Sequence, residues 1–211
     1  MDLVIISLLV LASIVGLTII IERGIALREK KVMPSEITAA VEACQSEGDL
    51  PMLKSICEKN RSTLGRLILF AEAHRRGTME ETVSALETRA RQEISKLERG
   101  LVILEINVGV APLLGLVGTI YGLISLFASM GDVGAGNSNE LAKGISIALN
   151  ATLLGLLTAI PSLVAWSYYS RKIDALSIEM ASICEDFLRR QARKVETETE
   201  STLVTPSFRR K

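Results

Sequence analysis

The stretch that decides the fold is residues 111–123, APLLGLVGTIYGL, which lies inside a run from Ile106 to Gly131 that carries no charged residue. About 20 apolar residues suffice to cross a bilayer, so the run is long enough for a transmembrane helix. It nevertheless contains a proline, a threonine and several glycines, which weaken a helix in water. Such residues indicate a span that packs against protein, because small residues let helices approach closely in lipid.

Two further charge-free runs, Leu3–Ile21 and Gly144–Ser170, also meet the length criterion. The 211 residues are 48% hydrophobic and their mean hydropathy is +0.34, which is too apolar for an ordinary soluble domain. The sequence therefore predicts an all-α membrane protein with three transmembrane helices. The formal net charge is zero, which argues against nucleic acid as a partner.

The basic residues predict the orientation of these spans. Residues 22–100 carry 14 Lys and Arg against 13 Asp and Glu, nine more Lys and Arg follow Ser170, and only Lys143 lies in the second connection. The positive-inside rule therefore places the N-terminus outside and the C-terminus in the cytoplasm. A signal peptide is disfavoured because Asp2 precedes the first apolar run and the basic residues follow it.

The expected organisation follows from the runs and the charges. It consists of a first transmembrane helix (1–22), a cytoplasmic helical region (23–100), a second transmembrane helix (101–131), a periplasmic loop (132–143), a third transmembrane helix (144–170), a cytoplasmic helix extension (171–194) and a disordered tail (195–211). Pro34, Asp49 and Ser62 mark the beginnings of three small helices, of which we expect the first to end at Gly48 and the third at Gly77.

The second and third transmembrane helices are expected to be very long and to extend into the cytoplasm. Thr78 and Glu81 fit a capping box, and apolar residues then recur at three-four spacing from Met79 to Val108. The stripe indicates a helix that continues into the second span. Apolar residues recur in the same way from Ile173 to Phe187, so the two helices should form an antiparallel hairpin.

Polar and small residues within the spans are the candidate functional residues. One face of the second span carries Gly115, Gly118 and Gly122, and we expect this face to pack against another helix. We expect Gly155 of the third span to lie in a helix contact as well. The candidate ion-pathway residues are Glu105, Pro112 and Thr119, spaced seven apart, with Ser146, Asn150 and Thr152 on the third span. The alternative for each threonine is a hydrogen bond to the carbonyl one turn back.

Catalysis and cofactors are not indicated. The sequence contains no nucleophile–base pair, no phosphate loop and no metal-ligand spacing around Cys44, Cys57, Cys184 or His74. We therefore expect no enzyme, no metal and no cofactor.

Several motifs resemble those of the MotA/TolQ/ExbB proton-channel family, and most closely its ExbB and TolQ branches. Residues 111–119, APLLGLVGT, resemble the second-span signature, and residues 144–156, GISIALNATLLGL, with Ala159-Ile160-Pro161, resemble the third-span signature. Ile21-Glu22-Arg23 and Leu97-Glu98-Arg99-Gly100 fit the same pattern. One departure is Ile147, which stands where the family signature often has an acidic residue.

The resemblance implies a channel or stator subunit of an ion-driven motor in the bacterial inner membrane. It implies a homo-oligomer, a pentamer in the family, around a smaller ExbD- or TolR-like subunit whose single span carries an aspartate. Thr119 and Thr152 would correspond to the two channel threonines, and a TonB-like or Tol system would receive the work. The alternatives are a structural membrane scaffold and a solute transporter subunit, although three spans without inverted repeats disfavour a transporter.

Overall fold

The structure is a computed structural model that describes residues 2–44, 46–74, 77–133 and 138–203. Over these residues the regular secondary structure is helical, with no strand, as the sequence predicts. The described residues divide into two compact units. The span unit comprises residues up to 25 together with 98–171, and the helical unit comprises residues 26–97 together with those from 172 onward.

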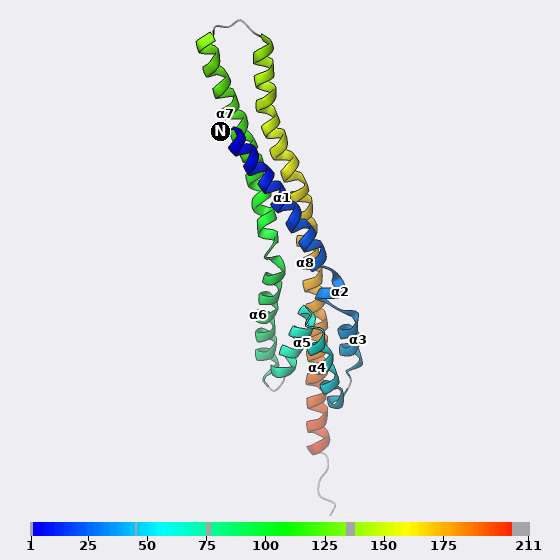
Figure 1. Ribbon diagram of the computed structural model, residues 1–211. Helices are drawn as coiled ribbons and strands as arrows, with labels where there is room; N and C mark the ends of the chain where they lie inside the picture. The colour runs from blue at the N-terminus through cyan, green and yellow to red at the C-terminus, as the bar shows by residue number, and fades with distance from the viewer. Residues whose placement is uncertain (1, 45, 75–76, 134–137, 204–211) are drawn as a thin grey trace, which may run out of the picture. The chain divides into compact units, whose positions relative to one another are not determined.

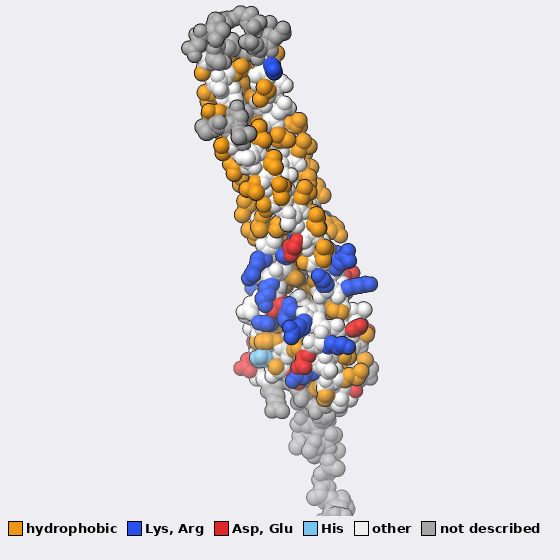
Figure 2. Space-filling view, viewed as in Figure 1, with side chains coloured by type: hydrophobic (Ala, Val, Ile, Leu, Met, Phe, Trp, Pro, Cys, Tyr) orange, Lys and Arg blue, Asp and Glu red, His pale blue; other side chains and the backbone are white. Residues whose placement is uncertain are grey.

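The span unit is built from α1 (Asp2–Ala26), α7 (Leu101–Val133) and the first part of α8 (Ser138–Leu203). Each helix contains a stretch long and apolar enough to cross a membrane, and these stretches are Val4–Ala26, Leu101–Ala128 and Ala142–Gln191. On the face that Figure 2 shows, hydrophobic side chains cover much of the surface of these helices. The prediction of an all-α membrane protein with three spans is therefore confirmed.

The three helices of the span unit meet through a small core. Ile5 and Leu9 of α1 pack with Ala111 of α7 and Ala159 of α8, and all four are buried. Figure 1 shows α1 lying along the antiparallel pair formed by α7 and α8. Most of the large hydrophobic side chains on the outer faces stay exposed, such as Leu113 at 60% and Ile124 at 61%. Such faces require lipid or protein to cover them.

The helical unit packs short helices against α6 and the second part of α8. Its elements are α2 (Glu29–Val32), α3 (Ser35–Ala43), the 3₁₀ helix η1 (Glu47–Asp49), α4 (Leu50–Lys59), α5 (Thr63–His74) and α6 (Met79–Glu98). Ile37, Leu64 and Ile68 lie in one apolar core with Met180 and Phe187 of α8. The capping box is formed, because Thr78 N donates to Glu81 Oε2 and Glu81 N donates to Thr78 Oγ1.

A buried carboxylate, Glu93, links α5 to α6. Its oxygens lie 2.6 Å from Arg66 Nη2, 2.7 Å from Lys96 Nζ and 3.1 Å from Arg89 Nη2. Burial raises the pKa of the Glu93 carboxyl, but the hydrogen bonds and charges of Arg66 and Lys96 outweigh burial and hold this pKa below its ordinary value. Glu93 is therefore ionised and paired at neutral pH.

One expected element is interrupted. The helix expected to continue from Thr78 into the second span ends at Glu98, and α7 begins at Leu101. Gly100 is buried under Arg23, whose Cζ and Cδ would lie 2.9 and 3.0 Å from a Cβ on residue 100. Glycine is a poor helix former, so the chain turns here rather than at Pro112, which α7 contains without interruption.

Other boundaries differ from those expected. α1 continues to Ala26, α2 was not expected, and α3 ends at Ala43 instead of Gly48. α8 begins at Ser138, inside the expected loop 132–143, and continues to Leu203, inside the expected disordered tail 195–211. Residues 162–205 contain no glycine or proline, which explains why the helix continues. Residues 134–137 and 204–211 of these two predicted segments lie outside the described residues.

Candidate functional site

The candidate site lies along the seam between α7 and α8, where the two backbones approach closely. A Cβ on Gly155 would lie 2.6 Å from the carbonyl oxygen of Ala111 and 3.1 Å from Cα of Gly115. A Cβ on Gly115 would likewise lie 2.9 Å from the carbonyl oxygen of Ala151. No side chain fits at either position, so only glycine allows this approach. Contacts between Cα–H groups and carbonyls then become available across the seam.

Gly118 and Gly122 continue the seam toward the α7–α8 connection. A Cβ on Gly118 would lie 2.7 Å from Cβ of Ala151, and one on Gly122 would lie 2.9 Å from Cβ of Ala148. The same position on Gly118 lies 3.3 Å from Ile5 of α1. The four glycines selected from the sequence therefore all lie in helix contacts of the span unit.

The hydroxyls of Thr119 and Thr152 meet in this seam. Their Oγ1 atoms are hydrogen-bonded to each other, and both also approach the carbonyl oxygen of Gly115, at 3.3 Å and 3.1 Å. Thr119 Oγ1 lies 3.2 Å from the carbonyl oxygen of Ala148 as well. Two hydroxyls carry only two protons, so these contacts cannot all be donated at once. The pair can therefore exchange donors without moving its oxygens.

A second polar contact joins all three helices of the span unit. Asn107 is 8% exposed, and its Nδ2 donates to Ser162 Oγ at 2.9 Å and to the carbonyl oxygen of Ala12 at 3.3 Å. Ser162 in turn donates to the carbonyl oxygen of Thr158 at 3.1 Å. Gly16 makes room, since a Cβ there would lie 2.7 Å from Asn107 Nδ2. Asn107 was not among the candidate site residues, but an amide inside a span is expected to face protein or water, and Asn107 does so here.

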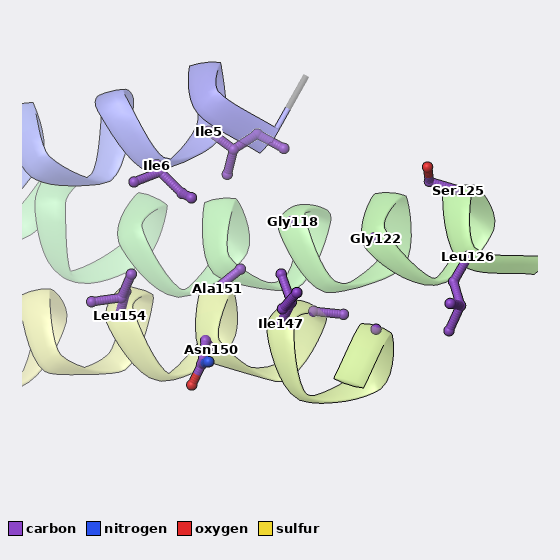
Figure 3. A pocket seen from close by; sticks show the side chains of 12 residues that line it. Ile5, Ile6, Gly118, Gly122, Ser125, Leu126, Ile147, Asn150, Ala151 and Leu154 are labelled. Carbon is purple, nitrogen blue, oxygen red and sulfur yellow. The ribbon is translucent and has the colours of Figure 1, made fainter. Parts of the chain in front are cut away.

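The remaining candidates do not join the threonine pair. Glu105, Ser146 and Asn150 are exposed in the single chain, and Pro112 is partly buried. The expected polar line of Glu105, Pro112 and Thr119 is therefore not one contact surface, because only Thr119 is turned into the seam. Figure 3 shows the Asn150 side chain directed away from α7.

An open cavity of about 490 Å³ lies beside the seam, among α1, α7 and α8 (Figure 3). Its lining includes Ile5, Gly118, Gly122, Ile147 and Leu154, with Asn150 and Ser125 as its polar side chains. Such a lining offers little to hold water or an ion, because a water needs two to four polar partners. Across the described residues, no group of three or more His, Cys, Asp or Glu side chains is placed to hold a metal.

This geometry defines a class of protein: an all-α, multi-pass membrane protein with paired hydroxyls in a glycine-lined seam between two spans. A model of the MotA/TolQ/ExbB proton channel family matches residues 51–182, which is more than half of the chain. The chain therefore belongs to the MotA/TolQ/ExbB proton channel family.

Individual relatives agree with this assignment. The chain is 35% identical over 167 residues to a biopolymer transport protein, ExbB-like 1, of Synechocystis sp., an alignment that covers 75% of the chain and 63% of the relative. It is 38% identical over 98 residues to the biopolymer transport protein ExbB of Helicobacter pylori, and this alignment covers 44% of the chain and 68% of the relative. It is 32% identical over 114 residues to the Tol-Pal system protein TolQ of Haemophilus influenzae, and this alignment covers 53% of the chain and 50% of the relative. The chain thus spans between half and about two thirds of the length of these relatives.

Proposed function

We propose that this chain is the channel subunit of an ion-driven motor in the bacterial inner membrane, which uses the proton-motive force to energise a TonB-like or Tol-like envelope system. The observation that carries the proposal is the meeting of the Thr119 and Thr152 hydroxyls inside otherwise apolar spans. Family membership supports the same function. The chain acts as a channel subunit rather than as an enzyme.

The seam is suited to passing a proton but not to holding one. A threonine hydroxyl can donate and accept at the same time, so two of them can relay a proton, yet neither titrates near neutral pH. A charge that crosses 100 mV releases about 2.3 kcal/mol, which a motor must couple to a conformational step. The titrating group at the middle of the membrane therefore comes from another chain.

That other chain is a smaller, ExbD- or TolR-like subunit with an aspartate in its single span. Copies of the present chain surround it as a homo-oligomer, a pentamer as in the family. The many exposed hydrophobic side chains of α1, α7 and α8 supply surface for such assembly and for lipid. In the membrane the N-terminus faces the periplasm and the C-terminus faces the cytoplasm.

A structural scaffold is the second candidate function, and one observation favours it. Both threonine hydroxyls also lie within 3.3 Å of main-chain carbonyl oxygens. In a scaffold, these hydrogen bonds would serve only to hold α7 and α8 together. The scaffold function predicts that removing either hydroxyl weakens assembly. A relay predicts that assembly survives and that proton transfer is lost.

Valine substitutions separate the two functions. Thr119→Val and Thr152→Val keep the shape of each side chain but remove its hydroxyl, and we expect both to abolish proton flux in vesicles that contain the chain and its single-span partner. The amount of assembled complex, measured by size-exclusion chromatography, should stay unchanged. Normal flux in both variants would remove the proton relay through these two hydroxyls, and loss of assembly in both would favour the scaffold.

Thr158→Val provides the matched control. Thr158 lies on α8, and its Oγ1 donates only to the carbonyl oxygen of Leu154 in the same helix, at 2.9 Å. Hydroxyls that bond the carbonyl one turn back have little effect beyond the helix itself. We therefore expect Thr158→Val to keep both flux and assembly.

A further inference from the structure

Glu105 is the charged residue that the polar seam does not use. It lies on α7 inside the apolar stretch Leu101–Ala128 and is the only charged residue of that stretch. Its side chain is exposed, and its carboxylate makes no ion pair or hydrogen bond with any residue that the structure describes. An ionisable group in a span is costly, so it must face protein or water in the assembled protein or lose its charge.

The contacts of Asn107 give the depth of Glu105 relative to α8. Asn107 is hydrogen-bonded to Ser162 on the antiparallel α8, so these two residues lie at the same depth. Glu105 precedes Asn107 by two residues and therefore lies about 3 Å from Ser162 along the helix axis, toward the beginning of α7, at 1.5 Å per residue. Arg171 is nine residues beyond Ser162 on α8, about 13 Å along the helix by the same rise. Glu105 therefore lies about 10 Å deeper in the apolar region than Arg171.

The contacts of α1 give a consistent depth. Gly16 lies beside Asn107, and Ile20 accepts a hydrogen bond from Tyr169, so α1 and α8 run in the same direction. Arg23 follows Gly16 by seven residues, which places Glu105 about 7 Å deeper than Arg23. Tyr169 also lies nearer than Glu105 to this basic end, at a level typical of interfacial tyrosines. Glu105 is thus on the apolar side of both arginines.

We propose that Glu105 binds and releases a proton in the ion pathway, at the level where the apolar part of the spans meets their basic end. This inference rests on the proposed channel function. A carboxylate is costly in apolar surroundings unless water or a cation reaches it, and a carboxyl group can both accept and donate a proton. A group with these properties can pass protons between the threonine seam and the basic side of the membrane.

Charged and titratable groups also lie on the elements that neighbour Glu105. They are Glu22 and Arg23 on α1, Glu98 and Arg99 before α7, and Tyr169 and Arg171 on α8. Arg23 is held by Glu22, with Nε 2.7 Å from Oε2, and it packs on Gly100. Its charge is therefore already partly compensated, and Glu105 has no dedicated counter-ion among these groups.

A hydrophobic carbodiimide provides the test. Dicyclohexylcarbodiimide adds to protonated carboxyl groups in apolar surroundings, so the full chain with its partner in native membranes should be labelled at Glu105, as measured by peptide mass spectrometry. The labelling should decrease from mildly acidic to mildly alkaline pH. Glu98, which is exposed just before α7, should stay unlabelled. Absence of label on Glu105 throughout this pH range would overturn the proposal.

Proton flux gives the second readout. Glu105→Gln keeps the size of the side chain but cannot release a proton, so we expect flux in vesicles to fall by about a hundredfold, the lower range for a positioned proton-transfer group. Glu105→Asp should retain part of the flux, and both variants should assemble normally. Full flux in Glu105→Gln would overturn the proposal. If Glu105 is labelled while the parent complex admits no protons, the channel function fails instead.

Discussion

At the scale of single residues, the seam combines rigid backbone contacts at glycines with hydroxyl groups that can rotate. The glycine contacts fix the distance between α7 and α8, since Gly115 and Gly155 face backbone atoms rather than flexible side chains. The Thr119 and Thr152 hydroxyls can rotate without any change in that distance. A rigid frame around groups that reorient freely is what a proton relay requires.

The glycine frame can be tested by adding one methyl group. Gly155→Ala would place a Cβ 2.6 Å from the Ala111 carbonyl oxygen, so α7 and α8 must separate. Overpacking of this kind costs typically 1–3 kcal/mol. We expect a lower thermal unfolding temperature in detergent and a loss of proton flux, because the two hydroxyls also move apart.

Gly109→Ala is the control for this substitution. Gly109 lies on α7, and a Cβ there would have no neighbour within 4 Å. Alanine favours a helix over glycine by up to about 1 kcal/mol, so this variant should be as stable as the parent or slightly more stable. Equal destabilisation by Gly109→Ala and Gly155→Ala would contradict a role for close packing at the seam.

Residue spacing predicted the glycine contacts better than the polar ones. A glycine face is decided by helix geometry alone, so Gly115, Gly118 and Gly122 could be placed from their spacing. Which neighbour a polar side chain finds depends on the register of a second helix, which spacing does not contain. An amide inside a span is expected to face protein or water, as Asn107 does, but spacing could not name its partners Ser162 and Ala12. Glu105 was grouped with Thr119 although the two do not meet.

At the scale of elements, α8 and α6 show what local sequence can and cannot decide. The absence of glycine and proline over residues 162–205 is visible in the sequence and fits the length of α8. The break between α6 and α7 falls at Gly100, on which Arg23, a residue far away in sequence, packs its guanidinium. A tertiary contact of that kind is invisible to periodicity, which indicated one continuous helix.

The link between α5 and α6 predicts a pH-dependent stability. The pKa of the Glu93 carboxyl is lowered in the folded protein, so its contribution is complete above the ordinary value of 4.5 and is lost as pH falls through the lowered pKa. Glu93→Gln should therefore cost about 1–3 kcal/mol at neutral pH, because Arg66 loses its charged acceptor. Thermal unfolding at neutral and acidic pH measures this difference.

The two pH conditions separate the ion pairs from simple packing. In sufficiently acidic solution Glu93 is itself neutral, so the parent and the Glu93→Gln variant should converge. A difference that stays constant with pH would contradict the pairing argument. Glu87→Gln is the control, because Glu87 is exposed on the same helix and its carboxylate has no ion pair within the described part of the chain.

At the scale of the whole molecule, the proposed channel function requires a central acid that another chain supplies. Its spans are covered with exposed apolar side chains, and Asn150 and Ser146 are exposed among them. Amides do not face lipid without cost, so these side chains need protein or water beside them. A homo-oligomer around a partner that carries the aspartate satisfies this requirement.

The most direct test of the central claim is proton flux into vesicles under a membrane potential, read by an enclosed pH-sensitive dye. We expect the chain alone to show no flux, and the chain reconstituted with the proposed single-span, aspartate-bearing partner to admit protons. Replacing that aspartate by asparagine should return the flux to background. Flux from the chain alone, or an assembled complex that admits no protons, would contradict the account.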